Sequence, residues 1–152
     1  MKFKYLITSL SVVLVLLLMY SFMYAQTVEE AFDAYKTTVK NRQYSSMAEY
    51  ATDESVQKDY HIMNDFFRDN FLNSCDNNPY TVEYNGSEEA VIYFRESRNG
   101  RANPYIFTKE NGKWKIDFIK MKQRIVFGEG NKWRWRQEGI GVNSDSDCFH
   151  KE

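Results

Sequence analysis

The sequence predicts an α+β domain in which N-terminal helices pack on one face of a curved antiparallel sheet. Apolar residues recur at helical spacing from residue 28 to about residue 72, and from residue 80 apolar and polar residues alternate as in strands. Helices followed by a run of strands are typical of α+β domains. The chain has 152 residues and a net charge of −1, which suits one domain, expected over residues 26–136.

Residues 1–25 precede this domain and differ from it in composition. Lys2 and Lys4 are followed by residues 5–25, which carry no charge. This pattern is typical either of a signal peptide cleaved after Ala25 or of a membrane anchor, because about 20 apolar residues span a bilayer core. Basic residues in front of such a segment stay in the cytoplasm. We therefore expect an exported domain, periplasmic or secreted if cleaved and otherwise membrane-anchored through residues 5–25.

Three helices are expected next. Thr27 and Glu30 have the spacing of a capping box, which predicts a helix from residue 28 to about residue 40. The same pattern at Ser46 and Glu49 predicts a short second helix. Apolar residues on one helical face then predict a third, long helix over residues 53–72.

The strands are predicted from two hairpin signals. Residues 80–84 and 90–94 flank Asn85-Gly86, and residues 105–108 and 113–118 flank Asn111-Gly112. These four strands form an antiparallel sheet in the simplest arrangement. A further hairpin is expected from residues 125–127 and 132–136, and residues 137–152 are expected to form a polar C-terminal tail.

The chain contains two cysteines, Cys75 and Cys148. In an oxidising compartment two cysteines so far apart are a candidate disulfide, which would tie the tail to the loop after the helices. Two independent thiols are the alternative.

Three stretches resemble the NTF2-like superfamily, which has the cystatin-like fold: residues 28–35, residues 41–51 and the hairpin of residues 105–116. The chain is similar to exported bacterial members of that superfamily. The resemblance implies a cone in which a curved sheet and helices enclose a pocket, and a homodimer through the open sheet face. It implies no single function, because this fold hosts enzymes, ligand binders and accessory domains.

We expect a non-enzymatic domain of the bacterial envelope that binds a small apolar ligand, a peptide or another envelope protein. Its binding residues are expected among the large apolar side chains of the third helix and the sheet. The candidates are Tyr60, Met63, Phe67, Tyr93, Tyr105 and Trp114. An ordinary hydrophobic core also contains such residues, which is the alternative interpretation.

An enzyme of the isomerase or dehydratase type is a second hypothesis. His61 and Asp65 lie four residues apart in the predicted third helix, so they would share a face and form a dyad of base and orienting carboxylate. An exposed helix pair without catalytic function is the alternative.

Other kinds of site find little support in the sequence. No metal or cofactor is expected, because the two histidines, His61 and His150, belong to no spaced set of ligands. Export argues against a nucleic acid partner. In residues 132–136 two tryptophans alternate with three cations, which fits either a half-buried strand or a strand that contacts a membrane or a partner. A membrane-anchored accessory or interaction domain is therefore a third hypothesis.

Overall fold

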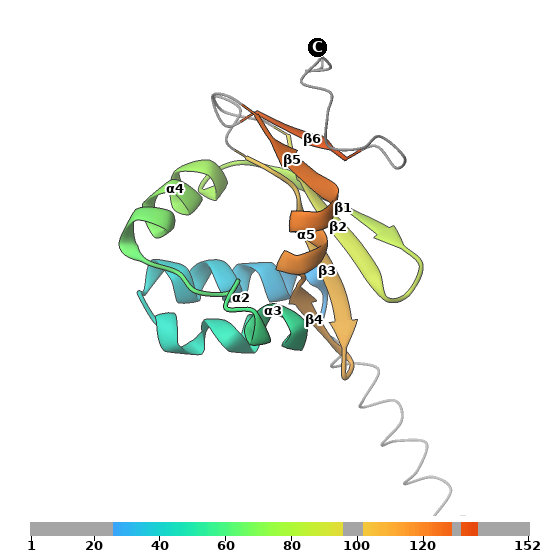
Figure 1. Cartoon of the computed structure of the whole chain (residues 1–152), viewed down its shortest axis with the longest axis horizontal. Helices are drawn as coiled ribbons and strands as arrows, with labels where there is room; N and C mark the ends of the chain where they lie inside the picture. The colour runs from blue at the N-terminus through green and yellow to red at the C-terminus, as the bar shows by residue number, and fades with distance from the viewer. Residues whose placement is uncertain (1–25, 96–101, 129–131, 137–152) are drawn as a thin grey trace, which may run out of the picture.

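The computed structural model describes residues 26–95, 102–128 and 132–136 and shows an α+β domain (Figure 1). The predicted segment 1–25 and the predicted tail 137–152 lie outside the described residues. Among the helices that are described, none is long and apolar enough to cross a membrane. The elements are, in order, α2 (Val28–Lys40), the 3₁₀ helix η1 (Tyr44–Tyr50), α3 (Asp53–Gln57), α4 (Asp65–Cys75), β1 (Tyr80–Asn85), β2 (Glu89–Phe94), β3 (Tyr105–Glu110), β4 (Lys113–Ile116), α5 (Phe118–Arg124), β5 (Ile125–Phe127) and β6 (Trp133–Trp135).

Helix α2 confirms the predicted capping box. The Thr27 hydroxyl accepts a hydrogen bond from the Glu30 amide at 3.1 Å, and the Glu30 carboxylate accepts one from the Thr27 amide at 2.9 Å. The apolar stripe of α2 is buried against the sheet, with Phe32 and Val39 0% exposed. Local sequence and burial therefore agree in this helix.

The other two predicted helices were only partly right. The second is a 3₁₀ helix, and no side chain caps its first turn. The predicted third helix is two helices, α3 and α4, separated by residues 58–64. Asp59 has a positive φ of 56°, which a continuing helix does not allow. The Asn64 side chain accepts a hydrogen bond from the Phe67 amide at 3.0 Å and so starts a new helix at Asp65.

The four-stranded sheet has the predicted antiparallel order β1-β2-β3-β4. Asn111 and Gly112 join β3 to β4 with φ values of 52° and 77°, so both have the left-handed conformation that a tight hairpin turn requires. The predicted hairpin signal at these two residues is confirmed.

Helix α5 was not predicted. The strand expected over residues 113–118 ends at Ile116, and the Asp117 carboxylate then accepts a hydrogen bond from the Lys120 amide at 2.9 Å, which caps the helix. Strands β5 and β6 form the last predicted hairpin, but they pair in a separate two-stranded sheet.

The N-terminal helix α2 packs on one face of the four-stranded sheet, and α5, which was not predicted, contacts the other face. The main core lies between α2 and the face that carries Ile92 and Phe107. On the other face Ile106 is 0% exposed, and the Tyr93 ring of β2 packs edge to face on Trp135 of β6 with centroids 6.2 Å apart. The sheet face that was expected to be open for a homodimer is thus covered in part by α5 and the β5–β6 hairpin, and the homodimer stays a prediction.

Candidate ligand-binding site

A cavity of about 750 Å³ lies between α4, the segment that precedes it and the elements around β3 and α5. We call it the aromatic cavity, because aromatic rings make up most of its wall. It is lined by Tyr35, Tyr60, His61, Ile62, Met63, Phe66, Phe67, Asn70, Phe71, Ser74, Asn103, Tyr105, Phe118 and Phe127.

The break between α3 and α4 builds one wall of this cavity. Residues 60–63 leave the helical path and present Tyr60, His61, Ile62 and Met63 to the cavity, while α4 adds side chains spaced three and four residues apart. A continuous helix over residues 53–72 would have presented only one stripe of these residues. The helix prediction is therefore wrong in the residues between α3 and α4, which form this wall of the aromatic cavity.

Several large apolar side chains of the aromatic cavity remain exposed. Ile62 is 63% exposed, Phe66 72%, Phe67 55% and Phe127 58%. Among the described residues, Tyr84 is the one large exposed apolar side chain that does not line this cavity. Exposed apolar residues that gather at one place mark binding surfaces, whereas single ones are ordinary.

The aromatic cavity also contains a few polar groups. The Nδ1 atom of His61 is buried and has no hydrogen-bond partner among the described residues. Burial raises the pKa of the Tyr35 and Tyr105 hydroxyls well above their ordinary value, so both remain protonated and can donate a hydrogen bond. Asn70 and Ser74 add neutral polar groups from α4. The lining thus offers hydrogen bonds, and among the residues that the structure describes it contains no carboxylate, lysine or arginine.

Four of the six predicted binding residues line the aromatic cavity: Tyr60, Met63, Phe67 and Tyr105. Tyr93 does not, because it alternates with the core residues of β2 and points to the opposite face of the sheet, toward Trp135. Trp114 does not either. It is 7% exposed in β4, packs edge to face on Tyr84 and lies under the Lys109 ammonium.

The structure does not form the predicted dyad of His61 and Asp65. The two residues share no helix face, because α4 begins only at Asp65. The Asp65 carboxylate accepts a hydrogen bond from the Tyr44 hydroxyl at 2.5 Å and lies 3.6 Å from the Arg42 guanidinium. The bond from Tyr44, helped by Arg42, lowers the pKa of Asp65. His61 instead lines the aromatic cavity.

Cys75 is a buried thiol at the end of α4, 3% exposed. Burial raises its pKa to about 12, so the reactive thiolate is scarce at neutral pH. Cys148 lies outside the described residues, and the disulfide stays a prediction.

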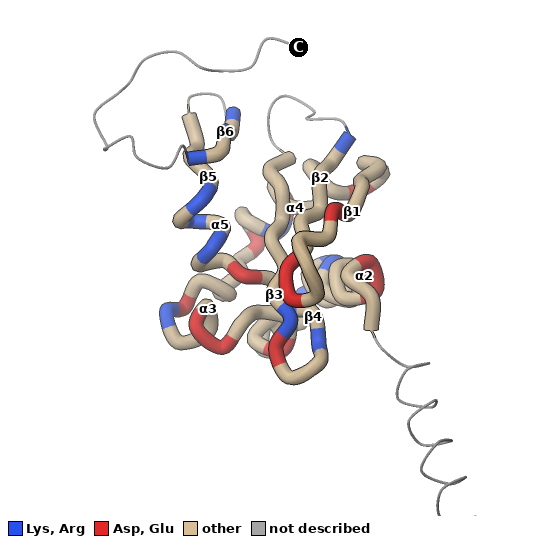
Figure 2. The backbone as a smooth tube through the Cα atoms, turned by 90° about the vertical axis from the view of Figure 1, so that its right-hand side faces the viewer, with Lys and Arg blue, Asp and Glu red and all other residues tan. Residues whose placement is uncertain are grey.

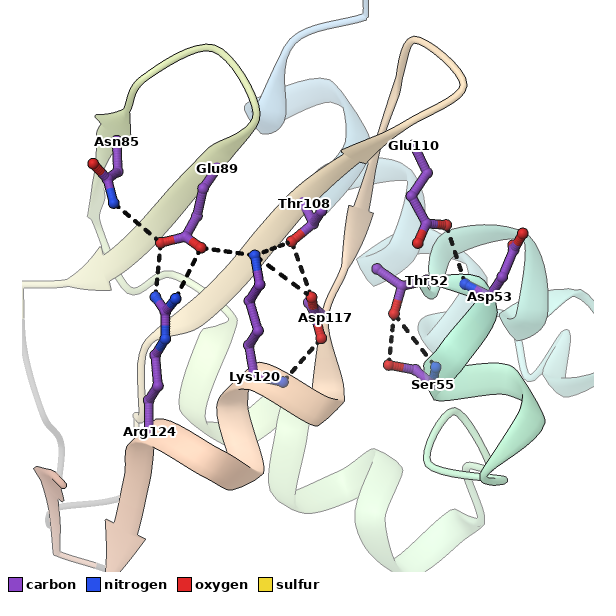
Figure 3. A network of polar contacts seen from close by, with 10 residues as sticks. All are labelled: Thr52, Asp53, Ser55, Asn85, Glu89, Thr108, Glu110, Asp117, Lys120 and Arg124. Carbon is purple, nitrogen blue, oxygen red and sulfur yellow. Dashed lines mark hydrogen bonds and ion pairs between the residues drawn. The ribbon is translucent and has the colours of Figure 1, made fainter. Parts of the chain in front are cut away.

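A partly buried network of polar and charged groups joins α5 to the sheet (Figure 3). The Glu89 carboxylate of β2 accepts hydrogen bonds from Arg124 at 2.7 and 3.2 Å and from Lys120 at 2.8 Å. Thr108 links Lys120 to Asp117. Burial alone would raise the pKa of Glu89, but the bonds from Arg124, Lys120 and Asn85 outweigh it and lower the pKa to about 2. Each of Glu89, Lys120 and Arg124 has a partner of opposite charge in this network, which favours a structural role.

A second, smaller cavity of about 420 Å³ lies beside α5 and shares Tyr60 with the aromatic cavity. We call it the cationic pocket. Its lining consists of Lys58, Tyr60, Ile119, Lys122, Gln123 and Arg136. Figure 2 shows that Lys and Arg positions follow one another along α5 and recur at β6.

Strand β6 supports the half-buried interpretation of residues 132–136. Trp133 and Trp135 are partly buried, and the Trp133 indole donates a hydrogen bond to the Ala102 carbonyl at 3.1 Å. Neither tryptophan lines the aromatic cavity or the cationic pocket.

Within residues 26–95, 102–128 and 132–136, no group of three or more His, Cys, Asp or Glu side chains is placed to hold a metal ion. Comparison of the chain with protein-family models, curated proteins and solved structures finds no match. The geometry of the two cavities is therefore the basis for a functional proposal.

Proposed function

We propose that this domain binds a small, largely apolar ligand in the aromatic cavity. The observation that carries the proposal is the gathering of Ile62, Phe66, Phe67 and Phe127 around one cavity while each stays more than half exposed. A folded protein gains stability when such side chains are covered, by about 0.8 kcal/mol for each buried methylene group. A ligand that fills the cavity would provide this cover.

The size and chemistry of the cavity support the same proposal. Small-molecule sites have volumes of about 300–1,000 Å³ and combine apolar walls with a few polar groups that orient the ligand. The aromatic cavity has about 750 Å³ and mixes aromatic rings with His61, Asn70 and two buried tyrosine hydroxyls. Since the described residues of its lining include no Lys, Arg, Asp or Glu, the part of the ligand inside it should be uncharged.

We also propose that the domain has the NTF2-like cone and acts after export, as the sequence suggests. The order of helices before the sheet and a cavity between them support the cone. Lys2, Lys4 and the uncharged residues 5–25 support export to the bacterial envelope, whether or not the segment is cleaved.

The test is binding of N-phenyl-1-naphthylamine, a neutral probe whose fluorescence rises in apolar surroundings. The protein is produced from the full chain, and two variants are compared, Phe67→Ala and Tyr84→Ala. Both side chains are 55% exposed, but only Phe67 lines the aromatic cavity. We expect saturable binding that Phe67→Ala weakens about tenfold, in the range for loss of a large apolar contact, while Tyr84→Ala leaves it unchanged. Equal effects of the two substitutions would refute the site.

An enzyme acting on a ligand in the same cavity is a second candidate. It is favoured by one observation, the buried and unpartnered Nδ1 atom of His61 in the cavity wall. The test is deuterium uptake from D₂O next to the carbonyl group of 2-decanone, since a base beside a bound ketone abstracts that proton. Uptake above the buffer rate that is lost in His61→Ala would support an enzyme. Uptake at the buffer rate together with probe binding supports a binding domain.

A further inference from the structure

The aromatic cavity and the cationic pocket lie side by side with Tyr60 in the wall of both. One is lined by apolar and neutral polar groups. The other is lined by three cations, Lys58, Lys122 and Arg136, and its lining includes no carboxylate of a described residue. A single molecule that reaches past Tyr60 would meet apolar surface at one end and positive charge at the other.

Two of the three cations are available to a ligand. Lys58 is paired with Glu54 at 2.7 Å. Lys122 and Arg136, in contrast, form no ion pair with any carboxylate of residues 26–95, 102–128 and 132–136, and both are exposed. Within the part of the chain that the structure describes, Lys122 and Arg136 are therefore positive charges without a carboxylate partner, and such charges attract anions.

The two available cations are held in place by their neighbours. The Lys122 ammonium lies 4.7 Å from the centre of the Tyr60 ring and also contacts the Tyr60 hydroxyl. The Arg136 Nε atom donates a hydrogen bond to the Gln123 carbonyl at 2.8 Å, and the Arg136 amide donates one to the Arg124 carbonyl at 2.6 Å. Lys122 is thus fixed at the border between the two cavities, and Arg136 is tied to α5.

We propose that the ligand is an anionic amphiphile, a long-chain carboxylate whose apolar chain fills the aromatic cavity and whose carboxylate binds Lys122 and Arg136 beyond Tyr60. This inference rests on the proposed function and adds the chemical class of the ligand. A carboxylate that accepts hydrogen bonds from an ammonium and a guanidinium forms the stronger, charge-assisted kind of bond. The neutral lining of the aromatic cavity suits the alkyl chain of the ligand, which carries no charge.

The experiment compares three probes that share a 12-carbon alkyl chain and differ in the head group: laurate, 1-dodecanol and dodecyltrimethylammonium. The protein is expressed from the full-length sequence, and we measure how well each probe displaces N-phenyl-1-naphthylamine at concentrations below micelle formation. Variants are Lys122→Ala, Arg136→Ala and, as a control, Lys113→Ala, since Lys113 is an exposed lysine that lines neither cavity. Circular dichroism confirms that each variant folds.

Laurate should bind about tenfold more tightly than dodecanol, and dodecyltrimethylammonium more weakly than both, in line with charge-assisted hydrogen bonds. Lys122→Ala and Arg136→Ala should each remove most of the difference in affinity between laurate and dodecanol. Neither substitution should change the affinity for dodecanol. Lys113→Ala should change the binding of neither laurate nor dodecanol. Added salt should weaken the binding of laurate alone.

Three results would overturn the proposal while the proposed function stands. The first is equal binding of laurate and dodecanol; the second is laurate binding that responds to Lys113→Ala as much as to Lys122→Ala. Binding to phosphatidylglycerol vesicles without binding of monomeric laurate would also overturn it, because the cations would then contact a membrane surface. Failure of all three probes and of N-phenyl-1-naphthylamine would refute the proposed function as well.

Discussion

The Glu89 carboxylate of β2 accepts two hydrogen bonds from the Arg124 guanidinium at the end of α5, at 2.7 and 3.2 Å. Lys120 donates a third bond at 2.8 Å, one turn earlier in the same helix. Glu89 is 8% exposed, and a charge that is buried to this extent destabilises the fold unless it has a partner of opposite charge. The Glu89 contact fixes α5 on the sheet, and α5 in turn carries Phe118 of the aromatic cavity and Lys122 of the cationic pocket.

The Glu89 contact should make the protein sensitive to acid. The pKa of Glu89 is about 2 in the folded protein against an ordinary value of 4.5. A lowered pKa contributes stability that is complete above about pH 4.5 and is lost as the pH falls toward 2; for this shift it amounts to about 3 kcal/mol. Urea unfolding at pH 7 and pH 3 should show about 2 kcal/mol of this loss, because Glu89 is still mostly ionised in the folded protein at pH 3. Glu89→Gln should lower the stability at pH 7 and flatten the pH dependence.

Glu88→Gln is the matched control for Glu89. Glu88 is exposed at the turn before β2, and its carboxylate accepts a weak hydrogen bond from the Ser87 hydroxyl at 3.4 Å. This substitution should leave both the stability and its pH dependence nearly unchanged. An equally steep loss in acid for Glu89→Gln and the parent protein would contradict the proposed role of Glu89.

Phe32 should contribute far more to stability than the exposed ring of Phe66. Phe32 is 0% exposed, and its ring lies 5.5–6.2 Å from five other aromatic rings, those of Phe71, Tyr80, Phe94, Tyr105 and Phe107. Phe32→Ala should cost about 3–5 kcal/mol in chemical unfolding. Phe66→Ala should change stability by less than about 0.5 kcal/mol and weaken binding of N-phenyl-1-naphthylamine, because Phe66 is 72% exposed in the cavity wall. A stability loss of similar size for both would show that Phe66 belongs to the core.

The break between α3 and α4 should depend on Asn64. Its side chain caps the first turn of α4, so Asn64→Ala should cost about 1 kcal/mol and also weaken binding in the aromatic cavity. Asn73 is the control, because it lies exposed inside α4 and caps nothing. Asn73→Ala should be neutral or slightly stabilising, since alanine favours helix. Thermal unfolding of both variants measures the difference, and a harmless Asn64→Ala would contradict the role of the cap.

Local signals in the sequence predicted the elements whose stabilising contacts are local. The capping box at Thr27 and Glu30 predicted α2, and Asn111-Gly112 predicted the β3–β4 turn, because in both cases the residues that contact one another are neighbours in the chain. Asn64 and Asp117 are caps of the same kind, and each directly precedes a helix. These two residues are the local signals in the sequence for the starts of α4 and α5.

The sites could be predicted only in part, because distant segments build them. Apolar residues at helical spacing indicated Tyr60, Met63 and Phe67, yet the same pattern suggested one continuous helix and a false dyad of His61 and Asp65. The contact between Glu89 and Arg124 joins residues 35 apart. It forms only in the folded protein, where α5 lies on β2. The cationic pocket likewise combines residues from three separate segments.

The thiol of Cys75 should react slowly in the folded protein. It is 3% exposed, so a reagent hardly reaches it. Its pKa is about 12, so little of the thiol is in the reactive thiolate form at neutral pH. In Cys148→Ser, which removes the second cysteine, iodoacetamide should label Cys75 only after unfolding in urea. Rapid labelling under native conditions would show that α4 opens readily at its end.

Chemical-shift mapping by two-dimensional NMR, with N-phenyl-1-naphthylamine as the ligand, tests the central claim most directly. The account predicts saturable shifts that gather on residues 60–63, on Phe67 and Asn70 of α4 and on Tyr105, while Tyr84 and Tyr93 on other surfaces stay unchanged. Shifts spread evenly over the molecule, or centred on Tyr84, would contradict a ligand site in the aromatic cavity.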